Sequence, residues 1–198
     1  MIPSEFERVV DWVAPGSRVL DLGCGDGALL AHLRDARQVR GYGLEIDIDN
    51  IVRCVARGVN VVQADLDQGL AEFETDSFDT VILLQTLQAV HYPANLLREM
   101  LRVGREGVVT FPNFGHWRAR AQLGLGGRMP VTPALPSQWF DTENILLFTI
   151  KDFEALCADE GIAVVEVVVL DTRRRASVLS RLWPTMFGEL AVYRVRRV

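Results

Sequence analysis

The most specific signal in this sequence is the stretch Asp21-Leu22-Gly23-Cys24-Gly25-Asp26-Gly27. It overlaps the end of an apolar strand candidate, Arg18 to Leu22, and precedes Ala28 to Arg34, which has helical character. Glycines at this spacing let the backbone turn sharply and approach a ligand, and the start of the next helix offers unpaired N–H groups. Strand, glycine-rich turn and helix in this order predict an α/β fold with a nucleotide-like ligand at the turn.

Outward from this turn, short apolar stretches alternate with amphipathic ones, as a doubly wound sheet requires. Helices are expected at four further places: 5–12, 51–57, 93–103 and 150–159. Six more strands are expected at 41–46, 59–64, 78–84, 107–111, 163–170 and 189–196. The pattern predicts a single α/β domain over residues 1–198, with a seven-stranded, mostly parallel sheet of Rossmann-like type.

Between residues 112 and 146 the regular pattern breaks. This stretch holds four prolines, at 112, 130, 133 and 136, and a group of glycines. Because such residues interrupt helices and strands, we expect an irregular excursion over the carboxyl edge of the sheet.

The composition excludes several classes of protein. The 198 residues carry 21 Lys plus Arg and 26 Asp plus Glu, a formal charge of −5, with 49% hydrophobic residues, which is typical of a globular protein and not of a disordered one. No apolar run approaches the roughly 20 residues that span a bilayer, and the N-terminus lacks the features of a signal peptide. A cytoplasmic protein is expected. Three widely spaced cysteines predict reduced thiols, with no disulfide framework and no metal site.

Charge is unevenly distributed along the chain. Residues 171–198 contain seven arginines, including the run Arg173 to Arg175, against two acidic residues. Aromatic residues do not interleave with that run, and the remainder of the chain is acidic and would repel phosphates, so binding to nucleic acid is not expected. A solvated face or a docking surface for an acidic partner fits the basic end better.

Two nucleotide-like ligands compete for the glycine-rich turn, because Gly23, Gly25 and Ala28 also satisfy the dinucleotide pattern GxGxxG/A. In a dinucleotide site the pyrophosphate lies over this turn, where the carboxylate of Asp21 would repel it. S-adenosylmethionine instead brings an ammonium and a sulfonium group, which an acid favours. The DxGxGxG arrangement resembles motif I of the class I S-adenosylmethionine-dependent methyltransferases.

That resemblance implies roles for further residues. Glu45 ends the second strand and would accept the ribose hydroxyls, Asp65 ends the third strand and would accept from the adenine amino group, and Leu66 would pack the ring. A helix-capping or surface carboxylate is the alternative for each acid. The cofactor would be S-adenosylmethionine or S-adenosylhomocysteine. The implied cofactor-binding residues are Asp21, Gly23, Cys24, Gly25, Glu45, Ile46, Asp65, Leu66 and Gln85.

Methyl transfer is a direct displacement, so the protein needs to supply positioning, desolvation and, for some acceptors, a base. His91 after the fourth strand and His116 after the fifth are candidates for that base. The alternative is that both form hydrogen bonds that fix their loops. The Asn-Pro-Pro-Tyr/Phe signature of amino-group methyltransferases is absent from the sequence.

Stretches outside motif I give a closer resemblance, to the MetW family. They are GYGLEID at 41–47, LQAVHYP at 87–93, FPNFGHWR at 111–118, GRMPV at 127–131 and SRLWP at 180–184. The resemblance implies a role in methionine biosynthesis as the partner of a homoserine O-acyltransferase of the MetX type. A working methyltransferase that acts on a small molecule remains the alternative.

Aromatic and arginine residues are concentrated in the irregular stretch and near the C-terminus. Trp117, Arg128 and Trp183 belong to the residue types that anchor protein interfaces, and we expect them to contact a partner. The alternative is that such residues cover the edge of the sheet and close a substrate pocket.

Overall fold

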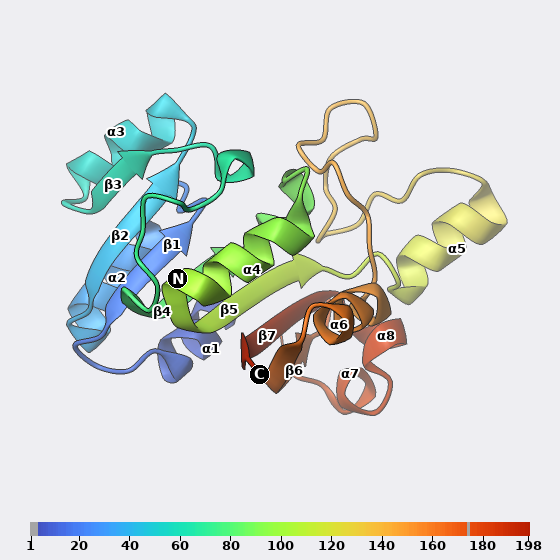
Figure 1. Ribbon diagram of the computed structural model, residues 1–198. Coiled ribbons are helices and arrows are strands. Elements are labelled where there is room, and N and C mark those ends of the chain that lie inside the picture. Colours follow the sequence, from blue (N-terminus) through green and yellow to red (C-terminus); the bar gives the residue numbers. More distant parts are fainter. Residues whose placement is uncertain (1–3, 174) are drawn as a thin grey trace.

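The computed structural model describes residues 4–173 and 175–198, so residues 1–3 of the N-terminal stretch and Arg174 of the arginine run lie outside it. Seven strands form one sheet in the order β3-β2-β1-β4-β5-β7-β6 (Figure 1). They are β1 (Arg18–Leu22), β2 (Arg40–Glu45), β3 (Asn60–Gln63), β4 (Phe78–Leu84), β5 (Gly104–Pro112), β6 (Ile162–Leu170) and β7 (Leu190–Arg197). The first five strands pair in parallel and β7 runs antiparallel to β5 and β6, which confirms the expected fold class.

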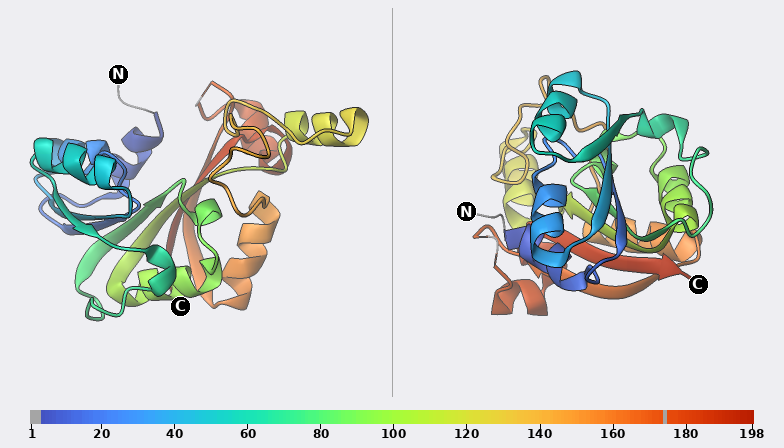
Figure 2. Two further views of the ribbon diagram at one scale, coloured as in Figure 1. Left: turned by 90° about the horizontal axis from the view of Figure 1, so that it is seen from above. Right: turned by 90° about the vertical axis from the view of Figure 1, so that its left-hand side faces the viewer.

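Helices cover both faces of the sheet (Figures 1 and 2). The helices are α1 (Ser4–Trp12), α2 (Ala28–Arg37), α3 (Ile48–Ala56), α4 (Pro93–Val103), α5 (Trp117–Gly126), α6 (Ile150–Asp159), α7 (Val178–Leu182) and α8 (Pro184–Phe187), with 3-10 turns η1 (Leu66–Gln68) and η2 (Leu87–Ala89). Over residues 4–173 and 175–198, none of these helices has the length and apolar character needed to cross a membrane.

Alternating side chains of the strands build two apolar layers. Val19 and Ile82 face α1, α2 and α3, whereas Leu20 and Leu83 face α4 and α6. Because successive side chains of a strand point to opposite faces, a stretch of strand buried on both sides is apolar, as Val81, Ile82 and Leu83 of β4 are.

Several boundaries agree with the sequence expectation because local signals fix them. Pro93 occupies the start of α4, and Thr149 and Asp152 form a capping box at the start of α6. Other boundaries differ. Helix α3 begins at Ile48 rather than at residue 51, because the Asp47 side chain accepts from the backbone N–H of Asp49 and caps the helix earlier.

The expectation of an irregular stretch over residues 112–146 is wrong in one part. Residues Trp117–Gly126 form α5, which projects away from the body of the molecule (Figure 1). Only Ala119 of this helix is buried, so the helix lacks the apolar periodicity by which sequence patterns are recognised. Helices α7 and α8 were likewise not expected; a capping box of Ser177 and Ser180 begins α7.

Candidate functional site

Glycines shape the turn after β1. Gly23, Gly25 and Gly27 have φ values of +72°, +55° and +75°, a region that side chains rarely adopt. A Cβ on Gly23 would lie 2.7 Å from Thr86 Oγ1, and one on Gly27 would lie 2.9 Å from Cys54 Sγ. Around Gly25, in contrast, there is open space. Gly23 and Gly27 therefore serve close packing, and Gly25 leaves room beside the turn.

A cleft of about 590 Å³ opens over the carboxyl ends of β1, β2 and β4. It brings together seven of the predicted cofactor-binding residues: Gly23, Gly25, Glu45, Ile46, Asp65, Leu66 and Gln85. The other two, Asp21 and Cys24, are buried and do not line it.

The walls of the cleft are acidic. Five carboxylates line it, from Glu45, Asp47, Asp65, Asp67 and Glu143, and none of its described lining residues is Lys or Arg. Low-dielectric walls of one sign concentrate ligands of the opposite charge. The cleft therefore attracts cations and disfavours phosphate groups.

Sequence reasoning missed Glu143, which the chain brings to the cleft from far away. The backbone N–H groups of Ile145 and Leu146 donate to the carbonyl oxygen of Gln88, at 2.8 and 2.9 Å. These two bonds attach the end of the long excursion to η2, beside the cleft. No local pattern in the sequence marks such an attachment.

Asp21 has a buried carboxyl group, one of whose oxygens has no hydrogen-bond partner in the region that the structure describes. It is 2% exposed, and its Oδ1 has no hydrogen-bond partner among the described residues. Burial raises the pKa of Asp21 to about 7, with the nearby charge of Glu45 as a second cause. A buried, unpaired polar group is costly, and a cationic group placed against it would remove that cost.

Glu45 braces the glycine-rich turn. Its carboxylate accepts from the backbone N–H groups of Gly25 at 2.7 Å, Ile46 at 2.9 Å and Asp47 at 3.0 Å. The same oxygens are the ones that the methyltransferase resemblance reserves for ribose hydroxyls. Glu45 thus joins the ends of β1 and β2 whether or not it also contacts a ligand.

Asp65 has a structural role as well. Its side chain accepts from the backbone N–H of Asp67 at 3.0 Å and caps η1. This is the capping alternative considered from the sequence, and it fixes the position of a carboxylate that still lines the cleft.

Cys24 packs beneath the turn against α3. Its Sγ lies 3.8 Å from Sγ of Cys54, and the Cys54 thiol donates to the carbonyl oxygen of Gly25 at 3.2 Å. Burial, followed by the charge of Asp21, raises the pKa of the Cys24 thiol. All three cysteines, including Cys157, are free and buried, as expected from their spacing.

The two histidines differ in their relation to the cleft. His91 Nδ1 lies 2.6 Å from Oδ2 of Asp67, and the His91 backbone N–H donates to Oδ1 of the same residue at 2.8 Å. Burial opposes ionisation of Asp67, but the hydrogen bonds and charge of His91 outweigh it and lower the pKa of that carboxyl. Since Asp67 lines the cleft, His91 is attached to its rim.

His116 lies outside the cleft, at the start of α5. It is buried, and its Nδ1 has no hydrogen-bond partner within the described part of the chain. Burial, and then the charge of Arg118, lowers its pKa, so the ring is neutral at pH 7. The backbone N–H of His116, and not its ring nitrogen Nδ1, holds this loop in place by donating to the Asn113 carbonyl oxygen at 3.1 Å.

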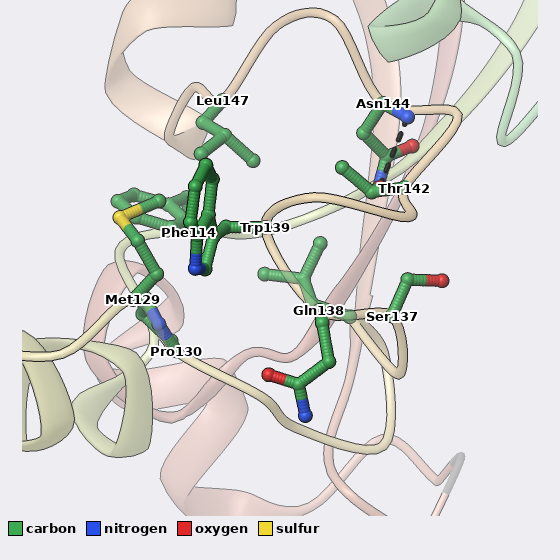
Figure 3. Close-up of a pocket in the computed structure, with 10 residues that line it drawn as sticks. Phe114, Met129, Pro130, Ser137, Gln138, Trp139, Thr142, Asn144 and Leu147 are labelled. Atoms are coloured by element: carbon green, nitrogen blue, oxygen red, sulfur yellow. Dashed lines mark hydrogen bonds between the residues drawn. The ribbon is translucent and has the colours of Figure 1, made fainter.

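Figure 3 shows a second hollow, within the excursion. Phe114, Met129 and Trp139 are among the residues that line it, and its volume is about 30 Å³. That space holds about one water molecule. It is far too small for a nucleoside, whereas the acidic cleft, at about 590 Å³, has room for one and contains the glycine-rich turn.

The three predicted partner-contact residues also lie apart from the cleft. Trp117 and Arg128 belong to α5 and the segment after it, and Trp183 lies between α7 and α8. All three are exposed.

Comparison with known sequences gives a consistent result. The family model described as "Methionine biosynthesis protein MetW" matches residues 3–195. The bifunctional methionine biosynthesis protein MetXA/MetW of Rhodopirellula baltica is 36% identical over 200 residues, covering 96% of this chain and 32% of that protein. A ubiquinone biosynthesis O-methyltransferase of Hahella chejuensis is 36% identical over 104 residues, covering 49% of this chain and 42% of that enzyme. The chain thus spans a third to less than half of these two relatives.

Among solved structures, the S-adenosylmethionine-dependent methyltransferase of Mesorhizobium loti superposes with a TM-score of 0.73 at 18% identity, covering 98% of both chains. A likeness at this identity shows a shared fold. With the family model matched over nearly its whole length, the chain belongs to the MetW family of methionine biosynthesis proteins and has the fold of a class I methyltransferase.

Proposed function

We propose that this chain binds S-adenosylmethionine in the acidic cleft and activates a homoserine O-acyltransferase of the MetX type as its partner. The observation that carries the first half is the buried, unpaired carboxylate of Asp21 beside a cleft lined by five further carboxylates. The fused relative supports the second half.

The charge of the cleft favours this cofactor over a dinucleotide. A pyrophosphate would meet carboxylates from Glu45, Asp65 and Glu143 without any lysine or arginine among the described lining residues. The ammonium of S-adenosylmethionine would lie at the turn of Gly23 and Gly25, where the buried carboxylate of Asp21 beneath it favours a positive charge, and its adenine would lie against Ile46 and Leu66. When bound, the cofactor would supply an electrophilic methyl group.

The relative in which a MetXA part and a MetW part form one polypeptide supports this choice of partner. Joining two proteins in one chain gives them a high effective concentration toward each other, which is useful where they act together. We therefore propose that the separate chain makes the same association by surface contact, with Trp117, Arg128 and Trp183 as candidate contacts.

Cofactor binding is tested by calorimetric titration with S-adenosylmethionine at pH 8. Asp21→Ala should weaken binding by at least about tenfold, as expected for loss of a buried charge pair. Asp35→Ala, which removes an exposed carboxylate paired with Arg34, is the matched control. If Asp21→Ala bound S-adenosylmethionine as tightly as the unaltered chain does, the assignment of the acidic cleft as its binding site would be contradicted.

Activation is tested with the purified MetX-type acyltransferase of the same organism, assayed with and without this chain and with and without S-adenosylmethionine. A large rise in acylation on adding the chain is expected. A further change with S-adenosylmethionine would make the chain a sensor of that cofactor. Unchanged acylation under all four conditions would contradict the partner role.

The pair of His91 and Asp67 favours a second candidate function, methyl transfer to a small molecule. A histidine oriented by a carboxylate at the rim of a cofactor cleft is the arrangement of a general base. Under this function, His91→Asn should lower methyl transfer while cofactor affinity stays unchanged. Methyl transfer without acyltransferase activation would favour this second function over the first.

A further inference from the structure

Helix α5 and the segment after it, residues 117–131, form an arm that extends from the carboxyl edge of the sheet (Figures 1 and 2). The arm lies at the opposite end of the molecule from α3 and β3 (Figure 1). The acidic cleft does not account for it, because none of the arm's residues lines that cleft.

The arm has a defined shape. Gln122 Nε2 donates to the carbonyl oxygen of Val131 and Gln122 Oε1 accepts from the Val131 N–H, both at 3.0 Å. At the end of the helix, Gly127 adopts φ +60° and its N–H donates to the Leu123 carbonyl at 3.1 Å. These bonds hold the returning segment against the helix, so the arm is ordered before any partner binds.

The arm exposes apolar side chains that this chain does not cover. Leu125 is 92% exposed, and Leu123 and Met129 are also exposed. Met129 lines the same small hollow as Trp139 (Figure 3), and the ring of Trp139 lies 5.7 Å from that of Phe140, which is also exposed. A ten-residue helix is marginal in water without a packed face, and exposed apolar side chains on such an element are typical of an interaction site.

Gly124 adds to this picture. It lies within α5, where glycine weakens a helix relative to alanine, and a Cβ there would meet nothing within 4 Å. Packing within this chain therefore gives no reason for the glycine. A surface that approaches the helix backbone from outside would give one.

Charge specifies the kind of partner. From Trp117 to Gln138 the sequence has no Asp or Glu but includes Arg118, Arg120 and Arg128, in a chain of net charge −5. Two copies that met arm to arm about a twofold axis would place these arginines against one another. A groove that is apolar at its centre and acidic at its rim complements the arm instead.

We propose that the arm is the element that docks on the MetX-type acyltransferase, in an apolar groove with an acidic rim. This inference rests on the partner role proposed above. Leu125 enters the groove, Gly124 lets the helix backbone approach it closely, and Arg128 meets the acidic rim.

The test measures binding of the full chain to the purified acyltransferase, by sedimentation velocity and calorimetry. Leu125→Glu should weaken binding by about tenfold to a hundredfold, as loss of a central interface contact does. Val52→Glu on α3, 62% exposed in the unaltered chain, is the matched control and should bind as the unaltered chain does. Thermal melts of both variants show that each is folded.

Charge complementarity gives a second readout. Arg128→Glu should weaken binding more at 50 mM salt than at 500 mM salt, since salt screens exposed charges. If Arg128→Glu weakened binding equally at both salt concentrations, the contact would not depend on charge, and the proposal of an acidic rim would be overturned.

The possible outcomes separate the two proposals. If the unaltered chain and Leu125→Glu bind the acyltransferase equally, the partner role stands and the arm is not the docking element. If the unaltered chain does not bind at all, the partner role fails and the arm proposal fails with it. Self-association that Leu125→Glu abolishes would overturn docking on the acyltransferase in favour of a second copy.

Discussion

Asp21 connects the stability of the chain to pH. Its pKa is about 7 in the folded chain, mainly because it is buried, against 3.8 for the unperturbed group. Between these values the folded chain holds a proton that the unfolded chain has lost, so stability falls as pH rises from about 4 to 7 and then levels off. Asp21→Asn removes this dependence. The free energy of unfolding of Asp21→Asn, relative to the unaltered chain, should therefore increase by about 2–3 kcal/mol between pH 5 and 8.

Urea denaturation at several pH values measures this difference. Asp35→Asn, at an exposed carboxylate, is the control and should show a difference that does not vary with pH. A pH-independent difference for Asp21→Asn as well would mean that Asp21 is not the buried titrating group.

The same carboxyl makes cofactor binding depend on pH in the opposite direction. A cation pairs with the ionised form of Asp21, so the affinity for S-adenosylmethionine should rise between pH 6 and 8 and then level off. Below pH 7 the pairing must release a proton. Calorimetry at pH 6.5 in phosphate and in imidazole buffer measures that release as a difference in binding enthalpy. Asp21→Asn should release none, and release by that variant would assign the proton to another group.

Which site residues could be predicted depends on how each reaches the cleft. Asp21, Glu45 and Asp65 stand at the ends of three strands that lie side by side, so the topology alone brings them to one edge. Glu143 reaches the cleft through a long connection that two backbone hydrogen bonds attach to Gln88. Backbone bonds of this kind do not depend on side-chain type, and the sequence therefore carries no sign of them.

The same contrast holds for whole elements. The bounds of β1, β4, α4 and α6 could be predicted because capping residues, proline and buried apolar runs mark them locally. Helix α5 could not, since its face toward the chain is limited to Ala119 and glycines stand where a stable helix has larger residues. The apolar residues Leu123 and Leu125 of this helix face away from the core, so they add no periodic pattern from which the helix could be predicted.

Two glycines, one inside a helix and one between two elements, should respond to replacement by alanine with changes in stability of opposite sign. At Gly124 in α5 a Cβ meets nothing within 4 Å, so Gly124→Ala should raise the free energy of unfolding by about 0.5–1 kcal/mol. At Gly188, between α8 and β7, a Cβ would clash with Val169 and with the Pro184 carbonyl oxygen, so Gly188→Ala should lower it by about 1–3 kcal/mol. Urea denaturation measures both.

A combined result is most informative at Gly124. If Gly124→Ala stabilises the free chain and yet binds the acyltransferase more weakly, the glycine serves the interface. Stabilisation with unchanged binding would leave Gly124 without a role at the docking surface.

Across the whole molecule, acidic and basic surfaces are separated. The cleft over β1, β2 and β4 is lined by carboxylates, whereas the arm carries arginines without neighbouring acids in sequence. On the proposals made above, the two surfaces would select ligands of opposite charge, a small cation at the cleft and an acidic protein surface at the arm. Because the arm does not line the cleft, a cofactor and a partner would then bind without competing for the same residues.

The fused relative provides a test of that arrangement at the scale of the assembly. A flexible tether holds two proteins at an effective concentration of about a millimolar, which exceeds the dissociation constant of a moderately weakened contact. Joining the chain to the acyltransferase through a Gly/Ser linker should therefore restore acylation to a Leu125→Glu variant that fails to activate when the two proteins are mixed. The unaltered chain, fused in the same way, sets the full activity. Fusion restores activity if Leu125→Glu has lost only its affinity for the acyltransferase and has kept its fold, which the thermal melt checks. A folded, fused variant that stays inactive would show that Leu125 is needed for activation itself and not only for docking.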